Sequence, residues 1–236
     1  TNLWVNPNVT YKKVSVDNET WIVSEECVKK IEFFEKEVKI IGDIQGSEII
    51  GKYATVLHNN QEIPILEAEF VEPGMGTGLV MSVPAHAPKD YQALMDLKAK
   101  NHELASKIEP IPIIVTPGYD AYPGKQICEK LGVSNQTDEK LEEATKELYL
   151  KEFTDGKLNE KCEQFNNEKV QYGRDKVRAW LQENNHLEKF PVLENSPVHC
   201  RCGAECVVKI LNNQWFLNYG DEEWKELARN CFDEMS

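Results

Sequence analysis

The stretch Glu72-Pro-Gly-Met-Gly-Thr-Gly-Leu-Val-Met-Ser-Val-Pro-Ala-His-Ala-Pro-Lys-Asp-Tyr91 joins a glycine-rich loop to a short apolar run and a proline-bounded turn. The glycines at alternate positions let backbone amides approach a ligand closely. The apolar run 79–83 predicts a strand, and Pro84 and Pro88 force a turn before a helix over 89–100. Asp90 then falls in the first helical turn, where the helix dipole favours its ionised form. The stretch predicts a pocket with a carboxylate in its wall.

The rest of the chain predicts an α/β core followed by charged helical sequence. Strands are expected at 3–5, 11–16, 38–41, 54–57, 63–71 and 111–115. Helices are expected after an N-cap at Ser24, at 123–131 with Gly132 as its stop, at 137–153, at 169–184, and after an N-cap at Asp221. A hairpin is expected at 206–217, with Asn212-Asn213 as its turn. We find no internal repeat.

Composition narrows the class of protein. The net charge of −13 over 236 residues argues against a surface that binds duplex nucleic acid, because neutralising phosphates needs clustered Lys and Arg. No run reaches transmembrane length, and the chain does not open with a signal peptide, so we expect no membrane partner. Seven cysteines, an odd number, do not predict a disulfide framework. We therefore expect a cytoplasmic protein.

Four segments together resemble one family. They are Thr1-Asn-Leu-Trp-Val-Asn-Pro7, the run GTGLVMSVPAHAPKDY that ends at Tyr91, Leu141-Glu-Glu-Ala-Thr-Lys-Glu-Leu-Tyr-Leu150, and Cys206-Val-Val-Lys-Ile with Gln214-Trp-Phe-Leu-Asn-Tyr-Gly220. Over nearly its whole length the chain resembles the editing domain, connective peptide 1, of archaeal and eukaryotic leucyl-tRNA synthetases. The resemblance implies a β-rich, barrel-like α/β fold of the class I synthetase editing type. It implies an editing core at 1–120, a helical insertion on its outside at 121–195, and a return to the synthetase catalytic core at 196–236.

The resemblance also implies post-transfer editing, in which a positioned water hydrolyses the ester of tRNA-Leu carrying isoleucine, norvaline or a similar wrong amino acid. It places Asp90 at the catalytic site as the anchor of the substrate's α-ammonium. Amides of Gly76, Thr77 and Gly78 would meet the terminal nucleotide, and Met81, Ser82 and Val83 would wall the amino-acid pocket. A separate hydrolytic pocket is needed because a synthetic site distinguishes two amino acids that differ by one methyl group by only about 1–3 kcal/mol.

The implied partners are the acceptor end of the mischarged tRNA and the remaining synthetase domains. Editing itself needs no cofactor, whereas ATP and Mg²⁺ would serve a synthetic domain outside this chain. Family members carry a threonine-rich segment just before the position of Thr1, so we expect this chain alone to hydrolyse the ester weakly or not at all. Bacterial members have an acidic residue where Ala87 stands, which leaves a second-carboxylate mechanism without support.

Individual residues of the stretch have other interpretations. An Asp in a first helical turn commonly serves only the helix. His86 is a general base by residue type, or a structural histidine in a turn; without an evident Ser or Cys partner we favour pocket lining. The glycines might suggest a dinucleotide site, but that fingerprint opens a helix, and here a strand follows.

One cluster suggests a metal, namely His199, Cys200, Cys202 and Cys206. Thiolates and imidazole suit zinc, but structural zinc sites usually present paired Cys-x-x-Cys knuckles, so we favour reduced cysteines beside a hairpin. The rival to an editing hydrolase is therefore a non-catalytic interaction or zinc-binding module. An editing domain of the isoleucyl or valyl type is a further alternative, which the leucyl-like segments at both ends of the chain disfavour.

Overall fold

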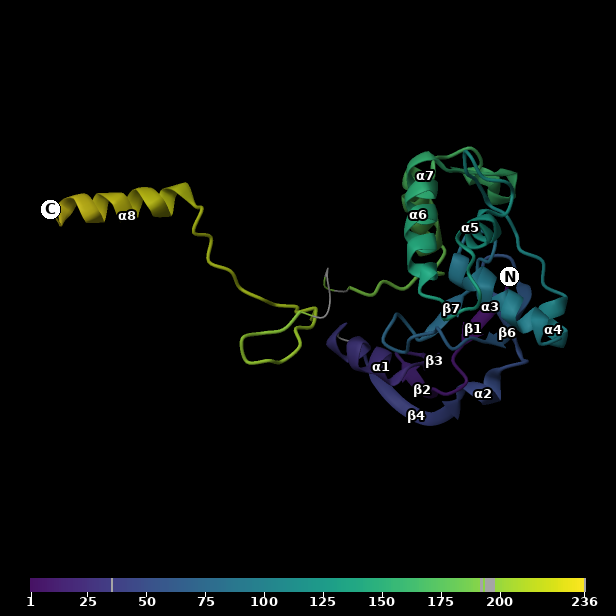
Figure 1. Ribbon diagram of the computed structural model, residues 1–236. Helices are drawn as coiled ribbons and strands as arrows, with labels where there is room; N and C mark the ends of the chain where they lie inside the picture. The colour runs from purple at the N-terminus through teal and green to yellow at the C-terminus, as the bar shows by residue number, and fades with distance from the viewer. Residues whose placement is uncertain (35, 192, 194–197, 236) are drawn as a thin grey trace.

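The computed structural model describes residues 1–34, 36–191, 193 and 198–235, and shows a mixed α/β fold built on two small sheets (Figure 1). One sheet has four strands in the order β5-β6-β1-β7, and a second has three in the order β3-β2-β4. A third, two-stranded sheet pairs Ile114–Val115 with Lys157–Leu158. The strands of the first two sheets are β1 (Leu3–Val5), β2 (Thr10–Val16), β3 (Glu19–Val23), β4 (Val38–Gln45), β5 (Tyr53–Val56), β6 (Gln61–Glu67) and β7 (Leu79–Met81). The α/β class predicted from the sequence is confirmed.

The four-stranded sheet carries the main core. β1 pairs in parallel with β6 and antiparallel with β7, so residues from three separate parts of the sequence lie side by side. Helix α3 (Pro88–Ala99) packs on this sheet, and α4 (Glu103–Ser106) follows it. The buried side chains between them are Trp4, Leu66, Ala68, Val71, Ala93, Leu94, Leu97, Ala105 and Ile108. Strand β6 ends at Glu67, four residues before the predicted end, because Ala68 and Val71 turn inward to join this core.

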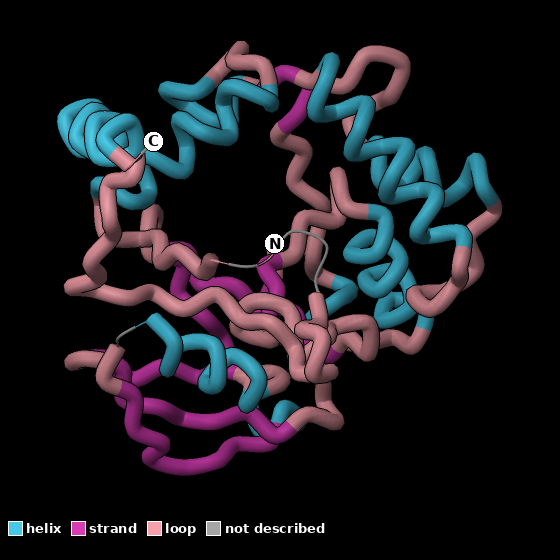
Figure 2. Tube along the Cα trace, turned by 90° about the vertical axis from the view of Figure 1, so that its left-hand side faces the viewer, coloured by secondary structure: helices cyan, strands magenta, loops and turns pink. Residues whose placement is uncertain are grey.

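The three-stranded sheet carries a second core under α1 (Glu25–Ile31), a helix that lies along the sheet in Figure 2. The Ser24 hydroxyl accepts a hydrogen bond from the Cys27 amide, as its N-cap position predicts. Strand β3, the 3₁₀ helix η1 (Glu32–Phe34) and α2 (Gly46–Ile49) were not predicted. A third cluster joins the two sheets through Val5, Tyr11, Ile44, Ile49 and Ile65.

The segment after Ala99 is mainly helical. It contains β8 (Ile114–Val115), α5 (Pro123–Leu131), α6 (Lys140–Asp155), β9 (Lys157–Leu158), the 3₁₀ helix η2 (Glu160–Phe165) and α7 (Val170–Glu183). Helix α5 has the predicted bounds, because Gly132 takes the left-handed conformation with φ of 63° that ends it. Helices α5 and α6 both pack against α3, so this segment adjoins the core. The expected division of the chain into an editing core and an outer insertion stays a prediction.

The last described part of the chain, 198–235, extends away from the two sheets in Figure 1. The hairpin predicted at 206–217 is wrong, since none of these residues lies in a strand, and the isolated bridge between His199 and Glu205 precedes them. Its aromatic side chains stay in solvent; Trp215 is 97% exposed. Helix α8 (Glu222–Glu234) begins where the Asp221 side chain accepts from the Trp224 amide, as predicted. The expected boundary between 195 and 196 lies outside the described residues.

Candidate functional site

Asp90 lies in the first turn of α3 and is almost fully buried. Its Oδ1 accepts from the Trp4 indole at 3.0 Å, and its Oδ2 accepts from the Val83 amide at 2.7 Å. Burial raises the pKa of Asp90 to about 6, although both hydrogen bonds favour the charged form and lower it. Desolvation therefore outweighs the benefit expected from the helix start. The carboxylate still has lone pairs free for another donor, because each oxygen can accept more than one bond.

A pocket of about 340 Å³ opens in front of this carboxylate. Its apolar walls come from the segment before the glycine loop, from the loop itself, from β7 and from the turn that leads into α3; they are Phe70, Val71, Met75, Val80, Met81, Val83 and Ala87. Glu72 and Lys89 stand in its lining, and Thr145 and Tyr149 of α6 complete it. A single buried carboxylate among apolar walls suits a small ligand that carries one cationic group beside an aliphatic side chain.

The three expected wall residues lie at the end of β7 and just after it, and they do not all reach the pocket. Met81 and Val83 line the pocket, whereas Ser82 between them is fully buried and does not line it. The Ser82 amide donates to the Asn2 carbonyl, and its hydroxyl has no hydrogen-bond partner among the described residues. Ser82 therefore belongs to the sheet rather than to the pocket lining.

The glycine loop is fastened to the three-stranded sheet and α1. The Tyr11 hydroxyl donates to the Gly78 carbonyl at 2.9 Å, and the Ser24 amide donates to the Thr77 carbonyl at 2.8 Å. Gly78 has a φ of 79°, and a Cβ there would stand 2.8 Å from the Ser24 Cβ, so no other residue fits. Its amide already donates to Met75, which leaves the loop amides of Gly74, Gly76 and Thr77 without an acceptor in the described chain.

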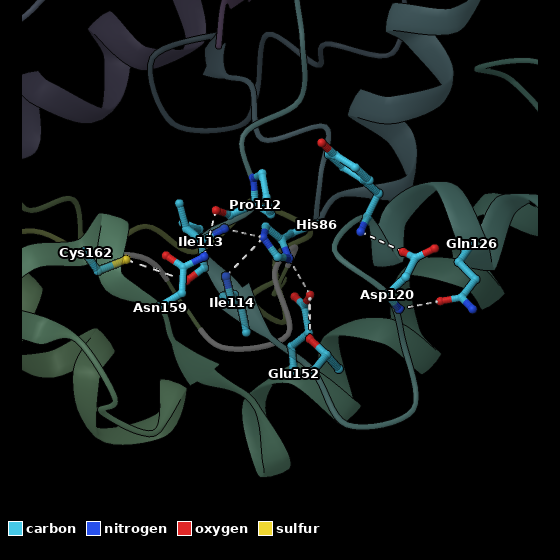
Figure 3. A network of polar contacts seen from close by, with 11 residues as sticks. His86, Pro112, Ile113, Ile114, Asp120, Gln126, Glu152, Asn159 and Cys162 are labelled. Carbon is cyan, nitrogen blue, oxygen red and sulfur yellow. Dashed lines mark hydrogen bonds and ion pairs between the residues drawn. The ribbon is translucent and has the colours of Figure 1, made fainter.

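His86 is buried away from the pocket lining, contrary to our expectation (Figure 3). Its Nε2 accepts from the amides of Ile113 and Ile114, at 2.9 and 3.2 Å. Since that nitrogen is an acceptor, Nδ1 carries the proton and donates to the Glu152 Oε1 at 2.7 Å. Thr116 also donates to Glu152. With both ring nitrogens occupied, His86 ties the Asp90 turn to β8 and α6.

The cysteine cluster lies at the surface of the protein. Cys200 and Cys202 are exposed and Cys206 is half-buried. Hydrogen bonds from Cys202 lower the pKa of the Cys200 thiol. In the part of the chain that the structure describes, no three His, Cys, Asp or Glu side chains meet closely enough to hold a metal ion. The expectation about zinc stays a prediction.

Two pocket residues that lie far along the chain from Asp90, Thr145 and Tyr149, were missed from the sequence. The helical spacing of Leu141, Ala144 and Leu148 correctly predicts the buried face of α6. Thr145 and Tyr149 each follow one of those positions and so border that face. Their position beside the apolar stripe was the available signal, but it does not tell which other element the border meets.

Comparison with known proteins identifies this arrangement. A family model described as the leucyl-tRNA synthetase editing domain matches residues 8–111, which include the glycine loop, Asp90 and all of α3. A leucine–tRNA ligase of Methanocaldococcus jannaschii is 42% identical over the whole chain. The chain belongs to the leucyl-tRNA synthetase editing-domain family. A leucine–tRNA ligase of Pyrobaculum islandicum is 39% identical, also over the whole chain. This chain spans only 26% of the length of each of these ligases.

Solved structures agree with the family assignment. The crystal structure of GlLeuRS-CP1 superposes with a TM-score of 0.72 at 26% identity, covering 82% of this chain and 79% of that one. The editing domain of the P. falciparum cytosolic leucyl-tRNA synthetase shares the fold, with a TM-score of 0.70 at 19% identity over 78% of this chain and 71% of that one. The described part of this editing domain contains no helix that is long and apolar enough to cross a bilayer.

Proposed function

We propose that this editing domain hydrolyses the ester of tRNA-Leu that carries a wrong aliphatic amino acid, such as isoleucine or norvaline. The observation that carries the proposal is the buried Asp90 carboxylate in an otherwise largely apolar pocket. An aminoacyl ester presents an α-ammonium next to an aliphatic side chain, which matches that combination. Asp90 would hold the ammonium, while Met81 and Val83 contact the side chain.

The pKa of Asp90 fits this role at neutral pH. With a pKa of about 6, the carboxylate without ligand is mostly ionised above pH 7. A bound ammonium would lower this raised pKa and so favour the ionised form. A charge-assisted hydrogen bond of this kind contributes about 1.5–3 kcal/mol. Below pH 6 the proton competes with the ammonium, so substrate binding should weaken as the pH falls.

The chemistry asks little more of the protein than positioning. The ester is already an activated carbonyl, so a held water and donors at the developing oxyanion are sufficient. The amides of Gly76 and Thr77 are suited to the terminal nucleotide, because neither has an acceptor in the described chain. Gly78 contributes differently from our expectation, because its amide donates to Met75 within the loop and its carbonyl accepts from Tyr11 of β2. The proposal requires neither a metal nor a covalent nucleophile.

The direct test is deacylation of isoleucyl- and norvalyl-tRNA-Leu, with leucyl-tRNA-Leu as the reference substrate. We propose that the chain alone is slow and that extension upstream through the threonine-rich segment of its relatives raises the rate by orders of magnitude. That magnitude follows because positioning contributes up to about 7–11 kcal/mol in well-oriented reactions. Failure of the extended protein to hydrolyse either mischarged tRNA would refute the proposed function. Equal rates with and without the extension would refute only the need for that segment.

A further inference from the structure

Helix α6 presents a continuous polar stripe to the Asp90 turn. The stripe consists of Glu142, Thr145, Tyr149 and Glu152, spaced by three, four and three residues, which places all of them on one side of a helix. Both ends of the stripe are bonded to residues close to Asp90 in the sequence. Glu142 pairs with Lys89 at 2.5 Å, and Glu152 accepts from His86 at 2.7 Å. The middle of the stripe, Thr145 and Tyr149, is thereby held against the pocket that Asp90 lines.

The two hydroxyls in the middle of this stripe have no partner in the described chain. The Thr145 Oγ1 is buried and makes no hydrogen bond, and the hydroxyl of the half-exposed Tyr149 makes none either. A threonine inside a helix usually satisfies its hydroxyl on the carbonyl four residues earlier. Thr154 of the same helix does so, donating to Leu150 at 2.9 Å. Thr145 is therefore an exception, and an unsatisfied buried hydroxyl in a native fold needs an explanation.

A bound ligand supplies that explanation. We propose that Thr145 and Tyr149 are positioning residues that donate hydrogen bonds to the ribose oxygens of an aminoacylated terminal nucleoside while Asp90 holds its ammonium. This inference rests on the proposed function. It gives helix α6 a role in substrate binding, although the sequence predicted that this segment lies outside the editing core. The ligand class is an amino-acid ester of a ribonucleoside, not a free amino acid.

The protonation state of Tyr149 agrees with a donor role. Burial raises its pKa to about 12, and the negative charges of Asp90 and Glu152 act in the same direction. The phenol thus remains neutral throughout the physiological range and adds no charge that would compete with Asp90 for the ammonium. Neutral donors suit ribose hydroxyls, because these oxygens carry no charge either.

The test is binding of a non-hydrolysable analogue, isoleucine joined by an amide bond to 2′-amino-2′-deoxyadenosine, titrated into this chain up to millimolar concentration. Tyr149→Phe and Thr145→Val should each raise Kd by about 2- to 12-fold, the usual net contribution of one hydrogen bond. Thr145→Ser, which keeps the hydroxyl, should retain the affinity. Tyr172→Phe is the matched control, since Tyr172 lies on α7 and does not line the pocket.

The thermal midpoint of each variant separates positioning from folding, and we expect all four variants to keep the midpoint of the unaltered chain. If the unaltered chain binds the analogue but Tyr149→Phe and Thr145→Val bind it as well as Tyr172→Phe does, the inference is wrong and the proposed function stands. If Thr145→Ser loses as much affinity as Thr145→Val, the hydroxyl is not the group that binds. If the unaltered chain does not bind the analogue at all, the inference fails, whereas the proposed function is decided separately by deacylation with the upstream-extended protein.

Discussion

Replacing Asp90 with Asn separates the functional role of the carboxylate from its structural role. The folded chain holds this group at a pKa of about 6, whereas an unburied Asp has a pKa of 3.8. Keeping it ionised at pH 7.5 therefore costs about 3 kcal/mol of folding stability. Asn removes that cost. It also turns one acceptor into a donor that faces either the Trp4 indole or the Val83 amide, at a cost of about 1–3 kcal/mol.

The two effects nearly cancel, so Asp90→Asn should leave the free energy of unfolding at pH 7.5 unchanged or raise it by up to about 2 kcal/mol. Activity should respond quite differently. Loss of a charge-assisted contact of about 1.5–3 kcal/mol to the α-ammonium should lower kcat/KM for deacylation by about 10- to 150-fold. The assays are deacylation of mischarged tRNA-Leu by the upstream-extended protein and chemical denaturation of the same variants.

The same helix offers a matched control. Asp96 also holds two donors, the Gln92 amide group and the Gln136 backbone amide, but lies outside the pocket lining. Asp96→Asn should lower stability and leave kcat/KM unchanged. An Asp90→Asn variant that is several kcal/mol less stable and still deacylates normally would show that Asp90 serves only to fasten Trp4 and Val83.

The pH dependence of stability gives a second result from the same variant. Because the folded pKa of Asp90 lies above the unfolded value, the folded state binds the proton more tightly. The contribution of this group to stability is therefore greatest below pH 4 and declines as the pH rises to about 6. Asp90→Asn should lack that decline. A decline of equal size in both proteins would mean that another group causes it.

Three further predictions concern residues around the pocket. His86→Ala leaves the buried Glu152 carboxylate with Thr116 as its remaining donor, and leaves the amides of Ile113 and Ile114 without their acceptor. It should therefore lower stability by about 3–5 kcal/mol, with kcat kept at temperatures below its midpoint, whereas His58→Ala, at an exposed position, should change neither. A selective loss of kcat in a stable His86→Ala protein would restore the general-base interpretation. Gly78→Ala should cost about 1–3 kcal/mol more than Gly76→Ala, because both have positive φ but only the Gly78 Cβ would collide with a neighbour; equal thermal midpoints would contradict this. Metal analysis of the reduced protein should find less than one zinc per chain, and one tightly held zinc that is lost in Cys200→Ser would show that the cysteine cluster is a metal site.

Local physics explains what could be predicted from the sequence. Helix α5 ends at Gly132 because glycine enters the left-handed conformation without a Cβ penalty, and α1 begins at Ser24 because a hydroxyl there satisfies a free amide. The turn at Pro84 and Pro88 and the first-turn position of Asp90 follow in the same way. The hairpin at 206–217 failed because its apolar pattern meets no sheet in the described chain that would bury one face.

Tertiary structure decided what those residues do. Asp90 receives its indole donor from Trp4, 86 positions away. Burial of its carboxylate in the folded chain, rather than its place at the start of a helix, raises its pKa. His86 became structural only because α6 brings Glu152 to it across 66 positions. Thr145 and Tyr149 entered the pocket by the same packing. Periodicity specifies which face of a helix is apolar, but the partner of its polar border depends on how distant segments pack, and no local pattern encodes that choice.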